Sequence, residues 1–315
     1  MTVLSRSRML AGAAVALVAG PRVVRAQALE KIRVAGVATD DTTPVYYAIK
    51  RGLYQKVGLD VEYVPTSSGT VATEAVISGT YELGKGSPLA FLIAHLKGLP
   101  VTLIGNANVW NPKVPFSLML VPADSTAKTG ADLNGAIFSS TAINDINALA
   151  MSSWIDKTGG NSKTIKWIEI PNSAAGAALA EHRIAATMLQ EPQLTAVLET
   201  GNVRVLAPAY SAISLRFASG VYFAQPDWAA KHADTIKKFT RVTYDAAAYT
   251  NAHHAETAAM MADVTKIPLE IISKISRNTS ATNSDPGLLQ PVIDVAAKYK
   301  SIERWFPAKE AYFTA

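Results

Sequence analysis

Short apolar segments alternate with helix-like segments of about ten residues along most of this chain, and this alternation limits the folds that it can adopt. The clearest strand is residues 58–65, where Leu59, Val61 and Tyr63 fall on one face. Strands that alternate with helices in this way form βαβ units around a largely parallel sheet. We therefore expect an α/β fold.

The alternating strands and helices form one complete set, and a second set then follows along the chain. We expect the first set of strands at residues 30–38, 58–65, 81–84 and 99–105, with helices from Pro44 (capped by Thr42 or Thr43), after Ser67 and from Pro88. We expect the second set of strands at residues 117–121, 136–140, 164–170, 183–189 and 202–207, with helices from near Thr141, from a cap at Asn172 or Ser173, and from Pro192.

Two connecting segments separate these sets, at residues 108–115 and 208–217. After the second connection come a strand at residues 220–224 and mainly helical segments, which would complete the first unit. The chain therefore predicts two lobes joined by two crossovers, with the second lobe inserted in the first. We expect residues 29–110 and 216–315 in the first lobe and residues 111–215 in the second.

Small hydroxyl residues and glycines recur where a strand passes into a helix. In an open parallel sheet, ligands bind beyond the carboxyl ends of the strands, where helix N-termini present unpaired N–H groups. Glycine allows close approach to that backbone, and hydroxyls add donors and acceptors. The alternative is ordinary helix capping, for which the same residue types are preferred. The candidates at these positions are Thr42, Thr43, Ser67, Ser68, Gly86, Ser87 and Thr141.

Other side chains could complete a cleft between the lobes. Tyr46 and Trp110 could stack against a flat or apolar part of the ligand, or pack in the core or at the hinge. Asn144 follows the Thr141 segment, and Glu191 could accept a ligand N–H or cap its own helix. The four hydroxyl-rich positions show no lysine or arginine, so we expect hydroxyls and backbone N–H groups, rather than a salt bridge, to bind the ligand.

Several segments together carry a family resemblance. Residues 42–69 (TTPVYYAIKRGLYQKVGLDVEYVPTSSG), 75–88 (AVISGTYELGKGSP), 131–135 (ADLNG) and 179–192 (LAEHRIAATMLQEP) follow one another as in periplasmic solute-binding proteins of ABC importers. The similarity is to the branch that binds alkanesulfonates, taurine, nitrate and the pyrimidine precursor of thiamine. It implies a two-lobed, type II Venus-flytrap fold that captures a small polar or anionic organic solute and delivers it to a permease in the inner membrane.

The chain departs from that family in the second lobe. His182, Ala185 and Gln190 stand where the resemblance leads us to expect glycine, aspartate and tryptophan. Asp40 and Asp41 would also lie at the mouth of the pocket, where an acid would repel a sulfonate or accept a hydrogen bond from an amide or amine. The identity of the ligand therefore does not follow from the resemblance.

The composition excludes several other functions. The chain has no cysteine and five scattered histidines, so it offers no thiolate metal site and no cysteine nucleophile. We expect no cofactor, no metal and no enzymatic activity. A sensing protein that reports to a signalling receptor would share the same binding residues and stays open as an alternative; an enzyme on the same fold is a more distant one.

The N-terminal 28 residues have the features of a cleavable export signal. Arg6 and Arg8 precede a 12-residue apolar run, and small residues at Ala26 and Ala28 suit cleavage, although a buried N-terminal helix is the alternative. Four of the basic residues lie here, and without them the net charge falls from +5 to +1. The remaining chain therefore lacks the excess of positive charge that is typical of nucleic-acid-binding proteins. Without a cysteine to carry lipid, we expect a soluble monomer in the periplasm of a Gram-negative bacterium.

This segment predicts a defined mature N-terminus. Sequencing of the protein from a periplasmic extract should begin at Leu29, or at Gln27 if cleavage follows Ala26. Protein that retains Met1 and fractionates with membranes would contradict the export prediction.

Overall fold

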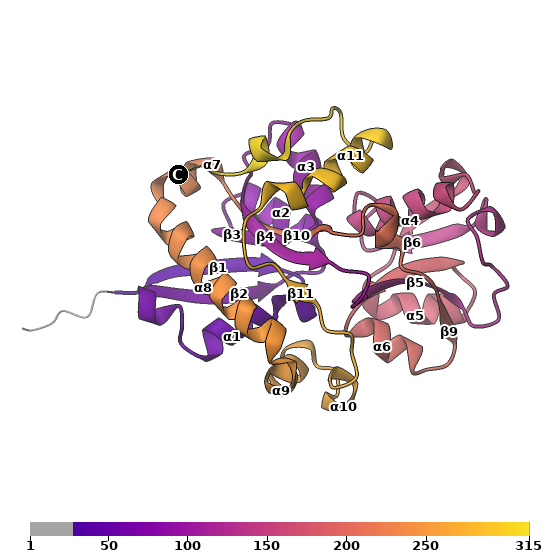
Figure 1. The fold of residues 1–315 in the computed structure, drawn as a ribbon, viewed down its shortest axis with the longest axis horizontal. Coiled ribbons are helices and arrows are strands. Elements are labelled where there is room, and N and C mark those ends of the chain that lie inside the picture. Colours follow the sequence, from indigo (N-terminus) through magenta and orange to yellow (C-terminus); the bar gives the residue numbers. More distant parts are fainter. Residues whose placement is uncertain (1–27, 315) are drawn as a thin grey trace, which may run out of the picture.

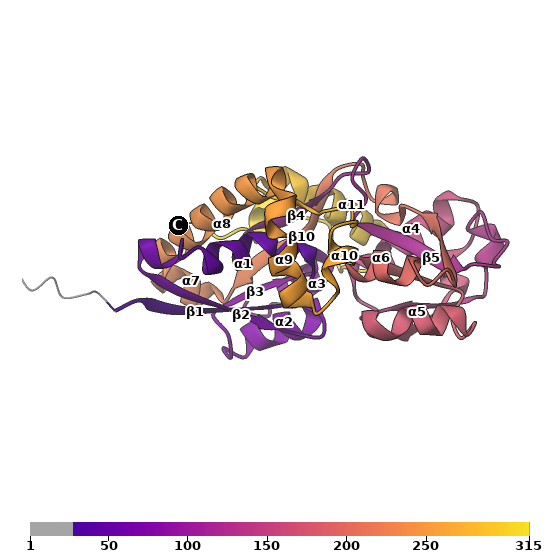
Figure 2. The same cartoon turned by 90° about the horizontal axis from the view of Figure 1, so that it is seen from below.

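The computed structural model describes residues 28–314, and residues 1–27 of the expected export signal lie outside the described range. Two β-sheets organise these residues, and each is the centre of one lobe (Figure 1). Figure 2 shows the two lobes side by side along the long axis of the molecule. The six-stranded sheet defines the first lobe, and the five-stranded sheet defines the second.

The sheet of the first lobe takes its strands from both ends of the described chain. Its strands are β1 (Glu30–Gly36), β2 (Leu59–Pro65), β3 (Leu83–Gly86), β4 (Thr102–Trp110), β10 (Phe217–Ala224) and β11 (Thr279–Ser280). They lie in the order β11-β4-β10-β3-β1-β2. β1 is parallel to β2 and β3, whereas β10 lies antiparallel between β3 and β4. The strand that returns from the second lobe therefore fills the centre of the first.

The sheet of the second lobe repeats this plan. Its strands are β5 (Ser117–Pro122), β6 (Ile137–Ser140), β7 (Lys166–Glu169), β8 (Ala186–Gln190) and β9 (Val203–Ala207), in the order β7-β6-β8-β5-β9. β6 is parallel to β7 and β8, and β5 lies antiparallel between β8 and β9. In each sheet the strand that follows a crossover is antiparallel to both of its neighbours, and in the first lobe the two-residue edge strand β11 is also antiparallel to β4. The expected parallel sheets are thus each interrupted by one inserted strand.

Helices cover both faces of each sheet. The first lobe contains α1 (Thr43–Lys50), α2 (Gly69–Ile77), α3 (Pro88–Leu96), α7 (Pro226–Lys231), α8 (Ala233–Ala252), α9 (His254–Thr265), α10 (Leu269–Ile272) and α11 (Gln290–Lys298). The second lobe contains α4 (Ile146–Lys157), α5 (Asn172–Ala180) and α6 (Gln193–Leu198). Successive side chains of β10 point to opposite faces of the sheet, and each face has its own apolar cluster. Tyr222 packs in the cluster with α1 and α8, and Phe223 packs in the cluster with α2, α3 and α11.

The chain crosses between the lobes after β4 and again before β10, and aromatic side chains pack where it does so. Trp110, at the end of β4, lies edge-on to Tyr210 with ring centroids 5.3 Å apart, and Tyr210 lies 5.5 Å from Phe217 at the start of β10. All three rings are fully buried. One apolar cluster therefore continues from the first lobe through both crossovers into the second.

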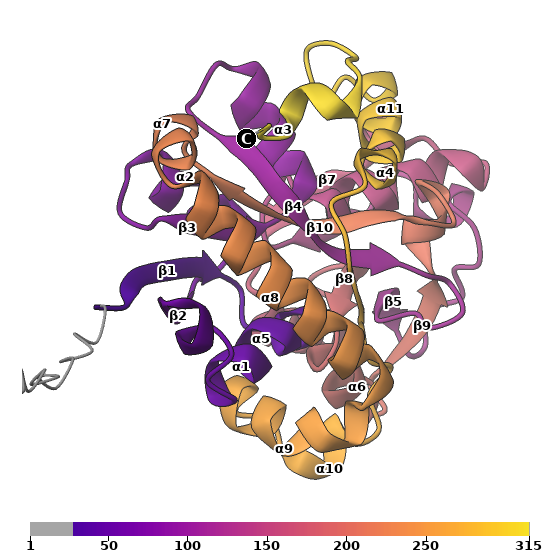
Figure 3. The ribbon, with the colours of Figure 1, turned by 60° about the vertical axis from the view of Figure 1, so that its left-hand side comes forward.

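On another side of the junction, α9 and α10 of the first lobe pack against the second lobe. Figure 3 shows the chain continuing from α8 into α9 and α10, which lie beside α6 of the second lobe. Ala196 of α6 packs against the cluster formed by Met261, Ile272 and their neighbours. Lys274 also pairs with Glu199 at 2.7 Å.

Several expected boundaries differ from the structure, for local reasons. β4 extends through Trp110, into residues that the sequence predicted as a crossover, because Asn108 is buried and donates a hydrogen bond to Ser219 of the neighbouring strand. α4 begins at Ile146 rather than near Thr141, because Asp145 is its N-cap. The N-cap of α5 is Pro171. Thr42, one of the two residues expected there, is the N-cap residue of α1, but its side chain makes no capping hydrogen bond.

Within residues 28–314, none of the helices combines the length and the apolar character that crossing a membrane requires.

The ion pair between Arg33 of β1 and Glu82, the residue before β3, predicts a pH-dependent contribution to stability. Glu82 accepts hydrogen bonds from the backbone N–H of Arg33 at 2.8 Å and from its guanidinium at 2.6 Å. Burial alone would raise the pKa of Glu82, but these hydrogen bonds outweigh it and hold the pKa below the ordinary value of 4.5. A carboxylate with a lowered pKa stabilises the fold above its unfolded pKa, and this contribution is lost as the pH falls through the folded pKa.

We therefore expect Glu82→Gln to lower the free energy of unfolding at pH 7 by about the net value of one charged hydrogen bond. Measured again at pH 3, the difference from wild type should be smaller. Glu62→Gln is the control, because the Lys31–Glu62 pair on the neighbouring strands is more than half exposed and should contribute little. Urea denaturation at both pH values measures each difference. Equal effects of the two substitutions would contradict this assignment.

Candidate ligand-binding site

A cavity of about 60 Å³ lies between the two lobes, at the carboxyl ends of their strands. The first lobe contributes residues after β1 (Thr39, Asp41), after β2 (Ser67, Gly69), on and after β3 (Lys85, Gly86, Ser87) and on β10 (Ser219, Gly220). The second lobe contributes residues after β6 (Thr141, Asp145), at the start of α4 (Ile146, Asn147), at the start of α5 (Asn172) and at the end of β8 (Gln190). This is the position at which an open parallel sheet binds ligands.

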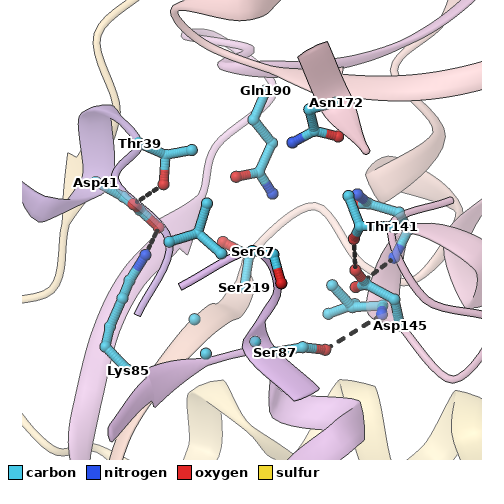
Figure 4. Close-up of a pocket in the computed structure, with 16 residues that line it drawn as sticks. Thr39, Asp41, Ser67, Lys85, Ser87, Thr141, Asp145, Asn172, Gln190 and Ser219 are labelled. Atoms are coloured by element: carbon cyan, nitrogen blue, oxygen red, sulfur yellow. Dashed lines mark hydrogen bonds and ion pairs between the residues drawn. The ribbon is translucent and has the colours of Figure 1, made fainter. Parts of the chain in front are cut away.

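A buried ion pair forms one wall of this cavity. The Lys85 ammonium contacts the Asp41 carboxylate, and each residue is about 5% exposed. The hydroxyl of Thr39 donates to the other carboxylate oxygen of Asp41 at 2.6 Å. Figure 4 shows Lys85 extending from its strand to Asp41 along the edge of the cavity. A charge that is removed from water requires such a partner, so the pair fixes both side chains.

Asp145 occupies the opposite wall, at the N-terminus of α4. Its carboxylate accepts from the hydroxyl of Thr141 at 2.9 Å and from the N–H of Asn147 at 3.2 Å. Burial raises the pKa of Asp145, and these hydrogen bonds oppose that effect. The N–H groups at this helix terminus, which have no partner within the helix, therefore already face an acidic side chain of the protein itself.

Ser87 connects the two walls. Its hydroxyl accepts a hydrogen bond from the N–H of Ile146 at 3.2 Å, so a residue at the N-cap of α3 in the first lobe contacts the start of α4 in the second (Figure 4). This hydrogen bond belongs to the arrangement in which the lobes are close together.

Uncharged amides line the remainder of the second-lobe wall. Figure 4 shows the side chains of Gln190 and Asn172 directed towards the cavity. The amide of Gln190 donates to the hydroxyl of Tyr210 at 3.1 Å, and that hydroxyl donates to Asn147 at 2.7 Å. The tyrosine, which lies in the aromatic cluster of the crossovers, thus orients two amides of the cavity wall.

A second buried ion pair lies directly behind the cavity. Asp40 accepts from the guanidinium of Arg277 at 2.6 Å and from the N–H of Asn278 at 2.7 Å. Arg277 also donates to the hydroxyl of Thr43 at 3.2 Å. The two adjacent acids of the sequence therefore face different partners: Asp41 faces the cavity and Asp40 faces the C-terminal part of the first lobe.

Four of the residues predicted from the sequence line the cavity: Ser67, Gly86, Ser87 and Thr141. Ser68, next to them, is the N-cap of α2 and accepts from the N–H of Val71 at 3.2 Å. The hydroxyls of Thr42 and Thr43 donate to the carbonyls of Thr39 and Asp40, at 2.6 Å each. These three hydroxyls therefore hold the local backbone.

The other predicted residues lie outside the cavity lining. Tyr46 packs against Tyr63, Trp110 is part of the aromatic cluster at the crossovers, and Asn144 lines a separate groove along α4. Glu191 is buried and accepts from the N–H of Thr195 at 3.0 Å, in its own helix, and from the N–H of Ser276 at 3.3 Å, in the first lobe. Its carboxylate thus contacts both lobes beside the cavity.

The sequence analysis missed Lys85, and this corrects the expectation that the strand-to-helix positions carry no base. Lys85 precedes Gly86 directly, and a register argument could have found it: with Leu83 in the core below β3, residue 85 shares the same face at the end of the strand. Of the three departures from the family pattern, Gln190 lines the cavity. His182 and Ala185 line a groove on the second lobe with Asp124. In residues 28–314, no three His, Cys, Asp or Glu side chains gather as a metal site would require.

A family model described as NMT1/THI5 like matches residues 39–257. The chain belongs to this family. The matched segment contains every residue that lines the cavity except Val37. A comparison with curated protein sequences gives no significant match.

Solved structures share the fold at low sequence identity. The alkanesulfonate-binding protein SsuA from Xanthomonas axonopodis pv. citri, bound to MOPS, is 18% identical with a TM-score of 0.77, covering 91% of this chain and 99% of that one. The periplasmic aliphatic sulphonate binding protein SsuA from Escherichia coli is 19% identical with a TM-score of 0.72, covering 90% and 92%. The periplasmic nitrate-binding protein NrtA from Synechocystis PCC 6803 is 15% identical with a TM-score of 0.64, covering 77% and 69%.

The expected fold is therefore confirmed as that of the periplasmic binding proteins. These three neighbours are binding proteins. Identity at this level establishes the fold, and the ligand of each neighbour is a property of that neighbour.

The close approach of α2 and β3 at the cavity predicts the effect of adding one methyl group. A Cβ on Gly69 would lie 2.7 Å from the backbone nitrogen of Ser87 and 3.2 Å from the Cα of Gly86. Backbone atoms cannot rotate away, so the start of α2 would have to move. We expect Gly69→Ala to lower the free energy of unfolding by about 1–3 kcal/mol, as overpacking does.

Val71→Ala is the control, because Val71 is an exposed residue two positions further along the same helix turn, and this substitution should change stability by less than about 0.5 kcal/mol. Chemical denaturation measures both variants. A Gly69→Ala protein as stable as wild type would show that α2 and β3 do not pack this closely.

Proposed function

We propose that this protein is the substrate-binding component of an ABC uptake transporter, and that it captures a small polar or anionic organic solute, sulfonate-like or pyrimidine-like, between its two lobes. The observation that carries this proposal is the cavity at the lobe interface, which receives strand ends and helix N-termini from both sides. A solute bound there contacts both lobes at once and favours the closed arrangement. Membership in the NMT1/THI5-like family and the fold shared with the sulfonate- and nitrate-binding neighbours support the same function.

The proposal includes the place where the protein acts. The expected export signal and the periplasmic location of the neighbours favour a soluble periplasmic protein of a Gram-negative bacterium, which acts as a monomer and delivers its solute to a permease in the inner membrane. In this proposal residues 29–110 and 216–315 form one moving body and residues 111–215 form the other. The absence of cysteine from the sequence is consistent with a protein that carries no lipid anchor.

The contacts with the solute are also part of the proposal. Ser67, Ser87 and Thr141 offer hydroxyls, and Gly69 and Gly86 allow the solute to approach the backbone. The amides of Asn172 and Gln190 add uncharged donors and acceptors from the second lobe.

The first test uses the solute that the protein itself retains. Gentle unfolding of purified protein followed by mass spectrometry should release a small organic solute. Adding this solute back should reduce the radius of gyration measured by small-angle scattering, because the lobes close around it. Unchanged scattering at saturation would contradict capture between the lobes.

Substitution of the hydroxyls then tests the contacts. Ser87→Ala and Thr141→Ala should each weaken binding of that solute by about 0.5–1.5 kcal/mol, the net value of one neutral hydrogen bond. Ser78→Ala is the control, because its exposed hydroxyl lies at the end of α2, where its hydrogen bonds are to the nearby residues Ala75 and Thr80. Calorimetric titration of the three variants gives the comparison. If Ser87→Ala and Thr141→Ala bind as wild type does, the hydroxyls serve the fold alone.

A further inference from the structure

The charges around the cavity restrict the solute more than the fold does. Of the sixteen residues that line the cavity in the described part of the chain, three carry charge: Asp41, Lys85 and Asp145. Two are acids and one is a base. With Asp145 ionised the lining has a net charge of −1, and with Asp145 protonated the net charge is zero. In neither state is the lining positive.

The only cationic side chain that lines the cavity in the described part of the chain, and the N-terminus of α4, already have acidic partners within the protein. The ammonium of Lys85 contacts the carboxylate of Asp41. The N-terminus of α4, which would otherwise attract an anion, is capped by the carboxylate of Asp145. An incoming anion would lose its hydration and would meet no cationic side chain that lacks an acidic partner. The N-termini of α2, α3 and α5, which also reach the cavity, offer backbone N–H groups alone.

The protonation of Asp145 does not change this conclusion. Burial raises the pKa of Asp145, against the hydrogen bonds from Thr141 and from the start of α4. Protonation would remove one repulsive charge, but it would add no positive charge to the lining. The second ion pair contributes none either, because the Arg277 guanidinium is committed to Asp40 behind the cavity.

We propose that the cleft selects a solute without net negative charge, which donates an N–H to Asp41 and presents an acceptor to Lys85, and that it discriminates against simple organic anions. This inference rests on the proposed function, and it narrows the solute to amides, amine-bearing zwitterions and neutral N–H heterocycles. Asp41 retains acceptor capacity beside the hydrogen bond from Thr39, and an ammonium has three N–H groups, of which Asp41 does not use all. A donor and an acceptor side by side on the solute match this pair.

Methanesulfonate is the probe, because it is a small sulfonate with no N–H group. Its binding is measured by thermal shift and by calorimetry, with sodium chloride at equal ionic strength as the reference. Wild-type protein should respond to methanesulfonate no more than to chloride. Asp41→Asn leaves the Lys85 ammonium without its acid and should bind methanesulfonate at least about tenfold more tightly than wild type, the equivalent of one hydrogen bond to a charged group.

The double variant Asp41→Asn/Lys85→Met is the matched control. It lacks both members of the pair, so it should lose the affinity that Asp41→Asn gains. Tight methanesulfonate binding by wild type that Lys85→Met abolishes would overturn the proposal, because Lys85 would then bind an anion with Asp41 in place. Equal, weak binding by wild type and Asp41→Asn would also overturn it, because Asp41 would not be the residue that excludes anions.

The wild-type titration keeps the proposal falsifiable if Asp41→Asn does not fold. Failure of the proposed function has a different signature: no solute is retained and none causes compaction, whatever the anion titration gives. If the retained solute proves to be an organic anion without an N–H group, the proposed function stands and this inference fails.

Discussion

A buried charged group needs a partner of opposite charge, and this requirement fixes the conformation of the turn after β1, on which the binding site depends. Asp40 and Asp41 are adjacent in sequence, and each meets a base from a distant part of the chain, Arg277 and Lys85. Removing one partner would leave an uncompensated buried charge, which costs about 3–5 kcal/mol. The turn after β1 is therefore held from two sides. It presents Thr39 and Asp41 to the cavity with little freedom to rearrange.

Most of the fold could be predicted because its signals are local. Strand β2 shows the alternation of a half-buried strand in both sequence and structure, and prolines mark the first turns of α1 and α3. The end of β4 could not be predicted from its residues, because Asn106 and Asn108 suggest a loop. Both are fully buried and donate to distant partners, Asp285 and Ser219, which only the folded chain brings near.

The candidate site was predictable to the extent that its chemistry is local. Ser67, Ser87 and Thr141 follow strand ends, and that position alone places them at the cavity. Tyr46 and Trp110 could not be assigned in this way, since an aromatic side chain packs equally well in a core. Asp145 was missed because its role depends on where α4 begins, and α4 begins later than the helical pattern suggested.

The fold and the charges of the cleft act at different levels. Parallel strands in both lobes bring helix N-termini to one cavity, and by themselves these termini would favour an anion. This chain places a carboxylate against one of these termini, through Asp145 at α4, and another against the cationic side chain of the lining, through Asp41 at Lys85. Neighbours with the same fold and different side chains can therefore hold different solutes. What the backbone offers is common to the fold, whereas the solute that is accepted depends on a few side chains at the strand ends. In the inference proposed above, Asp41 is the side chain that turns this cleft against anions.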